Sequence, residues 1–182
     1  MKIGRNSVAA SSLKSGLGTR PNMRILIAYS WCRDTTLAVV LAQEAIFKAI
    51  KNAAKLRDVG TIDTWLYRIL FNCWQDYLRV KGRNVEFVEM HDDDQPEHAE
   101  SYQQSQIVDR VRASIDQLPM QLREVVTLAD FAGLSYAGIS GIIDVPIGTV
   151  MSRLFRARQN LKQQLLDFGS EELAEFKLRR IK

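Results

Sequence analysis

The stretch from Leu134 to Arg158 contains the side chains with the most specific chemistry in this sequence. Asp144, Val145 and Pro146 interrupt a helical pattern there, because proline has no backbone N–H to donate and disfavours helix in the residue before it. Thr149 follows at a position from which its hydroxyl can cap the opening turn of a second helix. Two short helices joined by a tight turn form a helix-turn-helix, whose second helix enters the major groove of DNA.

The second helix is predicted to have one buried side and one side that donates hydrogen bonds. Its apolar residues repeat at helical spacing, at Val150, Leu154, Ala157, Leu161 and Leu165. The opposite side holds Thr149, Ser152, Phe155, Arg156 and Gln159, and the flanks hold Arg153 and Arg158. We predict that Arg156 reads a base edge, since its planar fork matches the two major-groove acceptors of guanine, and that the flanking arginines contact phosphates. The alternative is an amphipathic surface helix without a ligand.

A second candidate site lies on the predicted helix from Thr64 to Arg79. Its only wide polar stripe has the spacing i, i+4, i+7 and i+11 and consists of Arg68, Asn72, Gln75 and Arg79. Apolar and aromatic side chains, Trp65 among them, fill most of the remaining circumference. Such a stripe suits single-stranded nucleic acid, because arginine contacts phosphate, asparagine binds base edges and aromatic rings stack on bases. The alternative is a core helix with one solvated stripe.

The distribution of charge supports an anionic partner more strongly than the net charge of +4 does. Residues 1–83 hold 14 basic and 5 acidic residues, residues 84–104 hold 7 acidic and no basic residues, and residues 105–182 hold 11 basic and 9 acidic residues. Two basic or neutral blocks on either side of an acidic spacer are typical of proteins that bind polyanions.

Helical periodicity recurs along the chain and no alternating strand pattern appears, so the predicted fold class is all-α. The expected helices cover residues 23–32, 36–56, 63–80, 105–118 and 120–131, followed by the helix-turn-helix from Ser135. Lys81, Gly82 and Arg83 are expected to end the third of these helices. The sequence therefore predicts two small helical domains joined by a flexible acidic linker.

The predicted boundaries give residues 23–83 to the first domain, residues 84–104 to the linker and residues 105–168 to the second domain. Residues 1–22 are expected to be a disordered tail or the product of an upstream start codon, and residues 169–182 a basic tail.

The composition argues against several classes of protein. Cys32 and Cys73 are too few for a disulfide framework or a zinc site, and their apolar neighbours predict small buried hydrophobes in a reducing cytosol. No apolar run is long enough to span a membrane, and the N-terminus lacks the apolar region of a secretory signal, so we expect a cytoplasmic protein without membrane insertion. His91 and His98 both lie in the acidic linker, so we expect no catalytic residue, no metal site and no cofactor.

The helix-turn-helix resembles region 4 of the extracytoplasmic-function (group 4) sigma factors of bacterial RNA polymerase. The family pattern is matched in order by Leu118-Pro119, Arg123, Gly133-Leu134-Ser135-Tyr136, Pro146-Ile147-Gly148-Thr149-Val150, Ser152-Arg153 and Arg156-Ala157-Arg158. A single Gly-Thr-Val would mean little, whereas the whole set in order is highly specific.

The first domain resembles region 2 of the same family. The matching residues are Arg33-Asp34, Leu37-Ala38, Gln43-Glu44, Ala49, Thr64-Trp65-Leu66-Tyr67-Arg68-Ile69, Asn72, Asp76 and Arg79. The acidic linker lies where the family is variable.

The resemblance implies three partners. The first domain would bind the clamp helices of core RNA polymerase, through a face containing Gln43 and Glu44, and would melt the −10 element of promoter DNA. A flipped-out base would occupy a pocket made by the loop before Trp65 and by Asn72, within an interface of Trp65, Arg68, Asn72, Gln75 and Arg79. The second domain would bind the polymerase flap and the −35 element, the latter through Thr149, Ser152, Arg153, Phe155, Arg156 and Arg158. An anti-sigma factor would hold the chain inactive, and the chain itself would catalyse no covalent chemistry.

The chain departs from the family at positions that bear on function. Val39 and Val40 stand where acidic residues are usual, which removes charge from the polymerase-binding face. Gly138 and Gly141 replace polar residues in the first helix of the helix-turn-helix, and a helical glycine costs about 1 kcal/mol relative to alanine. Met151 stands where lysine or arginine is common, which removes one phosphate contact.

Two alternative functions stay open at this point. A sigma-like adaptor would titrate an anti-sigma factor without reading promoters; the valines and helical glycines favour it, and the intact groove-reading residues oppose it. A dimeric helix-turn-helix repressor would explain the second domain but not the helix from Thr64 to Arg79, and no heptad seam for dimerisation is visible.

Overall fold

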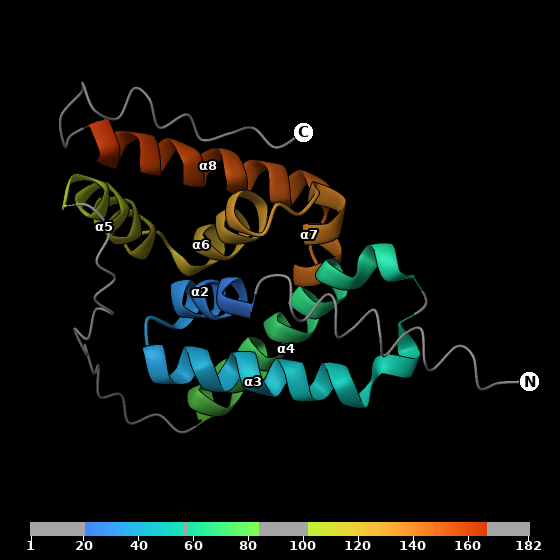
Figure 1. The fold of residues 1–182 in the computed structure, drawn as a ribbon. Coiled ribbons are helices and arrows are strands. Elements are labelled where there is room, and N and C mark those ends of the chain that lie inside the picture. Colours follow the sequence, from blue (N-terminus) through green and yellow to red (C-terminus); the bar gives the residue numbers. More distant parts are fainter. Residues whose placement is uncertain (1–20, 57, 84–101, 167–182) are drawn as a thin grey trace, which may run out of the picture. The chain divides into compact units, whose positions relative to one another are not determined.

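The computed structural model describes residues 21–56, 58–83 and 102–166. Every regular element in these ranges is a helix, so the predicted all-α fold class is confirmed (Figure 1). The chain forms two compact units. The first contains α2 (Pro21–Cys32), α3 (Thr35–Lys51) and α4 (Ile62–Arg83), and the second contains α5 (Tyr102–Asp116), α6 (Met120–Val126), η3 (Thr127–Phe131) and α8 (Ile147–Leu166).

In the first unit, α3 packs against both α2 and α4. The turn before α3 is made by Arg33, whose φ of 57° lies in the left-handed region. Asp34 then caps α3, because its Oδ1 accepts a hydrogen bond of 2.8 Å from the backbone N–H of Leu37. Two 3-10 turns, Ala53–Lys55 and Val59–Thr61, connect α3 to α4.

The core of this unit contains both large rings and small side chains. The buried residues of α3 are Ala38, Leu41, Ala42, Ala45 and Ala49. The rings of Trp31 and Phe71 meet edge to face with their centroids 5.7 Å apart. Cys73 is buried as predicted, and burial raises the pKa of its thiol. Cys32 is only half-buried, and its Sγ donates to the carbonyl of Asp34 at 3.2 Å.

In the second unit, α8 packs against α6 and α5. Val150, Leu154, Ala157 and Leu161 are each at most 3% exposed, which confirms the predicted apolar face, whereas Leu165 is half-buried. The segment η3 is one turn of π-helix, in which the N–H of Ala132 donates to the carbonyl of Thr127, five residues earlier. Single π-turns inside helical segments occur frequently at functional sites.

Several predicted helix ends were wrong. The helix α3 ends at Lys51 rather than at Leu56. The helix α4 continues through Gly82 to Arg83, whereas its last residue was expected to be Val80. The expected helix over residues 120–131 changes to π-helix at Thr127. α5 begins at Tyr102, so the last residues assigned to the linker are helical.

The predictions for residues 1–20, 84–101 and 167–182 lie outside the described residues, and the domain boundaries stay predictions. In the part of the chain that the structure describes, no single helix is both long enough and apolar enough to cross a membrane.

Candidate nucleic-acid interface

The predicted helix-turn-helix is formed by α7 (Tyr136–Ile143) and α8. The two helices are bent by 104° at their junction, within the range of about 90–120° found in this motif. Ser135 caps α7, because its Oγ accepts a hydrogen bond of 3.1 Å from the N–H of Gly138. Asp144 ends α7 with a left-handed φ of 55°.

The turn between α7 and α8 is closed by the side chain of Ser140, and not by that of Thr149. The Ser140 hydroxyl donates to the carbonyl of Val145 at 2.6 Å. α8 already begins at Ile147, so Thr149 lies inside its first turn and the prediction that it occupies the cap position was wrong.

The exposed side of α8 carries the predicted reading residues. Ser152 and Arg156 are exposed, Thr149 and Arg153 are half-buried, and Phe155 is 65% exposed. Arg156 Nε donates to the carbonyl of Ser152 at 3.3 Å, so the guanidinium lies along the helix surface. An exposed phenylalanine on such a helix can contact the methyl group of thymine.

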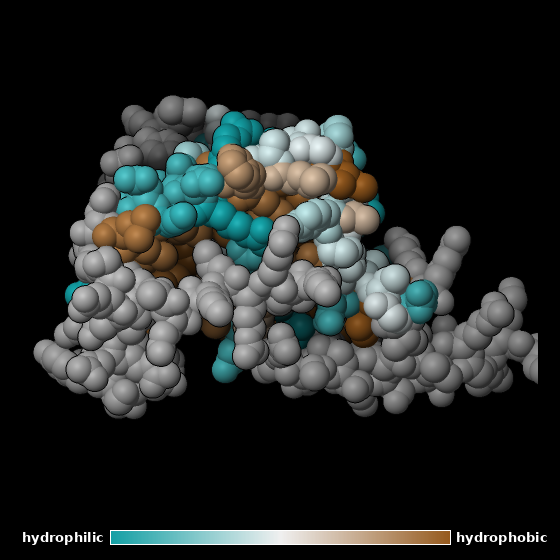
Figure 2. All heavy atoms as spheres, turned by 90° about the horizontal axis from the view of Figure 1, so that it is seen from above, coloured by the Kyte–Doolittle hydropathy of each residue, from teal (hydrophilic) through white to brown (hydrophobic). Residues whose placement is uncertain are grey.

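Exposed apolar residues extend beyond Phe155. Met151 is 53% exposed and Ile147 is 47% exposed, so the three residues form an i, i+4, i+8 stripe beside the polar ones. Figure 2, which views the molecule from above, likewise shows hydrophobic and hydrophilic residues interspersed on the visible surface.

Arg158 is placed differently from the other predicted −35 residues. Its Nη2 lies 2.5 Å from Oδ1 of Asp130, and its Nε lies 3.3 Å from Oδ2, which makes a two-point contact between α8 and η3. The two side chains are only 31% and 12% exposed. The hydrogen bond with Asp130, opposed by partial burial, raises the pKa of Arg158, and a hydrogen bond with Tyr136 adds to this effect.

Another motif residue, Arg123, also has a structural contact. Arg123 is buried, and its Nη2 donates to the carbonyl of Leu118 at 2.8 Å. It thereby binds a carbonyl in the connection between α5, which ends at Asp116, and α6. The family pattern around α8 thus mixes residues that hold the unit together with residues that face outward.

The predicted polar stripe of α4 is present. Arg68, Asn72 and Arg79 are exposed, and Gln75 is half-buried. Trp65 packs partly buried against the cluster of Ala49 and Leu66. Three further rings of α4, those of Tyr67, Phe71 and Trp74, are buried, as expected for a helix that is apolar around most of its circumference.

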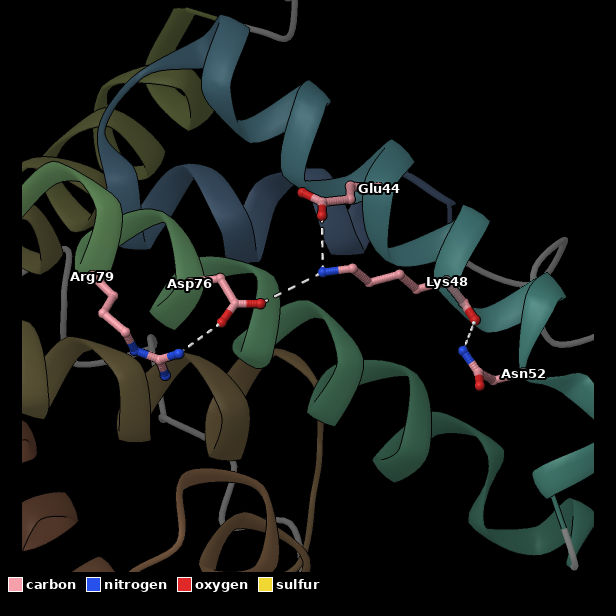
Figure 3. Close-up of polar contacts among 5 residues, drawn as sticks. All are labelled: Glu44, Lys48, Asn52, Asp76 and Arg79. Atoms are coloured by element: carbon pink, nitrogen blue, oxygen red, sulfur yellow. Dashed lines mark hydrogen bonds and ion pairs between the residues drawn. The ribbon is translucent and has the colours of Figure 1, made fainter.

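An ion-pair chain, which we call the α3–α4 network, joins the two candidate faces of the first unit (Figure 3). Lys48 Nζ lies 2.8 Å from Glu44 Oε1 and 3.6 Å from Asp76 Oδ2. Asp76 Oδ1 in turn lies 3.2 Å from Nη1 of Arg79. The hydrogen bond with Glu44 is the largest cause that raises the pKa of Lys48. The network connects a predicted polymerase contact, Glu44, to a predicted DNA contact, Arg79.

The exposed face of α3 includes residues that the sequence analysis missed. Gln43 and Glu44 are exposed as expected, and Val40 is 51% exposed. Phe47 and Ile50 are 67% and 60% exposed and lie further along the same helix. Val40 and Phe47 are seven residues apart, a spacing that places them on one face and that the sequence already contained.

Comparison with known proteins identifies both units. The Sigma-70 region 2 family matches residues 22–84, and the Sigma-70, region 4 family matches residues 109–161. The RNA polymerase sigma-H factor of Pseudomonas aeruginosa is 36% identical over 146 residues, which cover 72% of this chain and 75% of that protein. The ECF RNA polymerase sigma-E factor of Escherichia coli is 36% identical over 140 residues, which cover 69% and 72%.

Solved structures agree in fold. The sigma factor RpoE of Bartonella quintana, crystallised with the anti-sigma factor NepR, matches with a TM-score of 0.72 at 25% identity, over 84% of this chain and 96% of that chain. CnrH, in complex with the cytosolic domain of CnrY, matches with a TM-score of 0.63 at 20% identity, over 91% and 97%, and supports the fold alone.

The chain has sigma-70 regions 2 and 4, which define a transcription initiation factor. It belongs to the extracytoplasmic-function group of the sigma-70 family.

Proposed function

We propose that this chain binds core RNA polymerase and directs promoter recognition and melting, with α8 reading the −35 duplex and α4 holding the melted −10 strand. The observation that carries the proposal is the reading face of α8. Polar side chains at helical spacing point outward from a helix whose opposite side is fully packed. An adaptor that never touched DNA would have no need of such a face.

At the −35 element, the exposed residues of α8 and its half-buried residues are assigned different roles. Arg156 and Ser152 are exposed on the reading face, so they are assigned to base edges, together with Phe155 as an apolar contact. Arg153 and Thr149 are half-buried at the edge of this face and are assigned to the phosphate backbone. The same unit is assigned to the polymerase flap.

At the −10 element, α4 offers hydrogen-bond donors and one partly exposed ring, that of Trp65. Asn72 is exposed between Arg68 and Arg79, and its amide can both donate to and accept from a flipped base. The arginines and Gln75 are assigned to the strand backbone. The partly exposed Trp65 is assigned to the wall of the base pocket.

The polymerase contact is assigned to the exposed face of α3. Gln43 and Glu44 supply polar groups, and Val40 and Phe47 supply exposed apolar area. Large apolar side chains more than half exposed are typical of protein interfaces when they occur together. Phe47 is therefore added to the residues expected to contact the clamp helices.

Control by an anti-sigma factor completes the proposal. The support is the likeness to RpoE of Bartonella quintana, which was crystallised with the anti-sigma factor NepR. The identity of such a partner for this chain is left to experiment.

Run-off transcription tests the proposal. Core polymerase is incubated with promoter DNA that the chain has selected from a randomised library, with and without the chain. Specific transcripts that appear only when the chain is present support the sigma function. Binding to an anti-sigma factor without any transcript would support the adaptor instead.

A further inference from the structure

The contact between Asp130 and Arg158 links the reading helix to the π-turn. The two residues are 28 positions apart, and both guanidinium contacts reach the carboxylate, at 2.5 Å and 3.3 Å. A charge-assisted pair with two contacts fixes direction as well as distance. Both side chains are more buried than those of any ion pair in the α3–α4 network.

The position of Arg158 on α8 explains why it can make this contact. A rotation of about 100° per residue places it about 40° from the buried Leu154 and about 160° from Arg156. Arg158 therefore lies next to the packed side of the helix, about 60° from Phe155 and far from Arg156. Bound in this way, its charge is largely satisfied before DNA arrives.

The packed side of α8 consists of apolar side chains, which decide which face of the helix is buried and resist large rotations by close packing. Its buried contacts come from Val150, Leu154, Ala157 and Leu161, and apolar contacts are not directional. The two-point hydrogen bond between Arg158 and Asp130, at one edge of that side, adds a directional constraint to this packing.

We propose that Asp130 is a positioning residue, which acts through Arg158 to set the rotation of α8 and so the direction in which Ser152, Phe155 and Arg156 face the −35 bases. Arg158 is then a structural arginine of the reading helix and not a phosphate contact. The inference rests on the proposed function, because it concerns how the −35 element is read.

A double-mutant cycle with the full chain tests this role. The variants are Asp130→Asn, Arg158→Ala and their combination, and the control is Arg153→Ala, an arginine of the same helix assigned to phosphate. Affinity is measured by fluorescence anisotropy with the selected −35 duplex and its single-base variants over a salt series. Circular dichroism and thermal unfolding show that each variant is folded.

We expect Asp130→Asn and Arg158→Ala each to lower the affinity about 10- to 100-fold, matching the loss of a charge-assisted bond. The double variant should be no weaker than either single one, because both remove the same contact. Discrimination between bases should fall in all three, and the slope of log affinity against log salt should stay as in the wild type. Arg153→Ala should keep base discrimination and flatten the slope by about 0.9.

Three results would overturn the positioning role. One is an Asp130→Asn variant that binds as tightly as the wild type. Another is an Arg158→Ala variant that flattens the salt slope as Arg153→Ala does. The third is additive losses in the double variant. If the wild-type chain itself showed no sequence-dependent duplex binding, the proposed −35 function would fail, and the positioning role would fall with it.

Discussion

The two helices proposed to read DNA, α4 and α8, each hold one arginine in an ion pair, and the two pairs differ in exposure. On α4, Arg79 pairs with Asp76 of the same helix, and the two side chains are 66% and 54% exposed. On α8, Arg158 pairs with Asp130 of another element, and the side chains are 31% and 12% exposed. Exposed pairs are screened by water and salt, so a phosphate can replace the partner of Arg79 easily. An arginine on a reading helix is therefore not by itself evidence of a DNA contact.

An acidic residue, Asp76, lies next to the polar stripe of α4, and its charge is compensated by neighbouring basic side chains. Asp76 lies among the predicted DNA contacts, where a lone carboxylate would repel the strand. Lys48 and Arg79 approach it from two sides, at 3.6 Å and 3.2 Å, and compensate its charge. The α4 stripe is thus an exchangeable set of charges, whereas α8 combines exposed readers with one fixed pair.

The largest expected effect concerns Asn72 on α4. Asn72→Ala should slow open-complex formation by an amount corresponding to a few kcal/mol, the approximate cost of flipping a base that the pocket no longer binds. Helical content and polymerase binding should not change, because the side chain is exposed. Permanganate footprinting of the −10 region measures the melting. Loss of helicity would instead make Asn72 structural.

The next effect concerns Arg156 on α8. Arg156→Ala should cost about 1–3 kcal/mol of duplex affinity and relax the preference at one base position. Arg153→Ala should instead weaken binding to all duplex sequences alike. Anisotropy titrations against single-base variants separate the two. A uniform loss for Arg156→Ala would show that the reading face has been assigned wrongly.

A smaller effect is expected on α3. Val40 is exposed where the family usually has an acid, so Val40→Asp should strengthen binding to core polymerase, by about 0.2–1 kcal/mol at low salt. Titration of labelled chain with core polymerase provides the measurement. Weaker binding would indicate that Val40 and Phe47 contribute an apolar contact that the new charge disrupts.

The smallest effect is expected in the α3–α4 network. Lys48→Met should lower the free energy of unfolding by less than about 1 kcal/mol, because its pairs are exposed and screened. Urea unfolding at low and high salt tests this. A salt-independent loss of more than about 2 kcal/mol would mean that the network is a structural element, and the contrast with α8 would disappear.

Local sequence signals were sufficient for most of the fold. The 3.6-residue period predicted the buried side of α8, and Pro146 predicted the turn before it. These signals failed at the end of α4, because a glycine in the last turn does not by itself end a helix. Gly82 has no neighbouring atom that a side chain would meet, and α4 simply continues through it.

The site was predictable to the extent that it depends on one helix. The stripe of α4 and the exposed face of α8 both follow from spacing within a single element. The pairing of Arg158 with Asp130 cannot be predicted from such spacing, because the two residues are 28 positions apart. Asp130 also lies in a π-turn that no local sequence pattern predicts. Phe47 was not predicted as a site residue, although its seven-residue spacing from Val40 is present in the sequence.

The central claim is that α4 and α8 read different promoter elements, and one factorial experiment tests it most directly. Holoenzymes with wild-type chain, Asn72→Ala or Arg156→Ala are assayed by run-off transcription on promoters with single-base changes in the −10 or the −35 element. The account predicts that Arg156→Ala becomes insensitive to one −35 change and keeps its sensitivity to −10 changes, and that Asn72→Ala shows the reverse. Equal loss of sensitivity at both elements in either variant would contradict it.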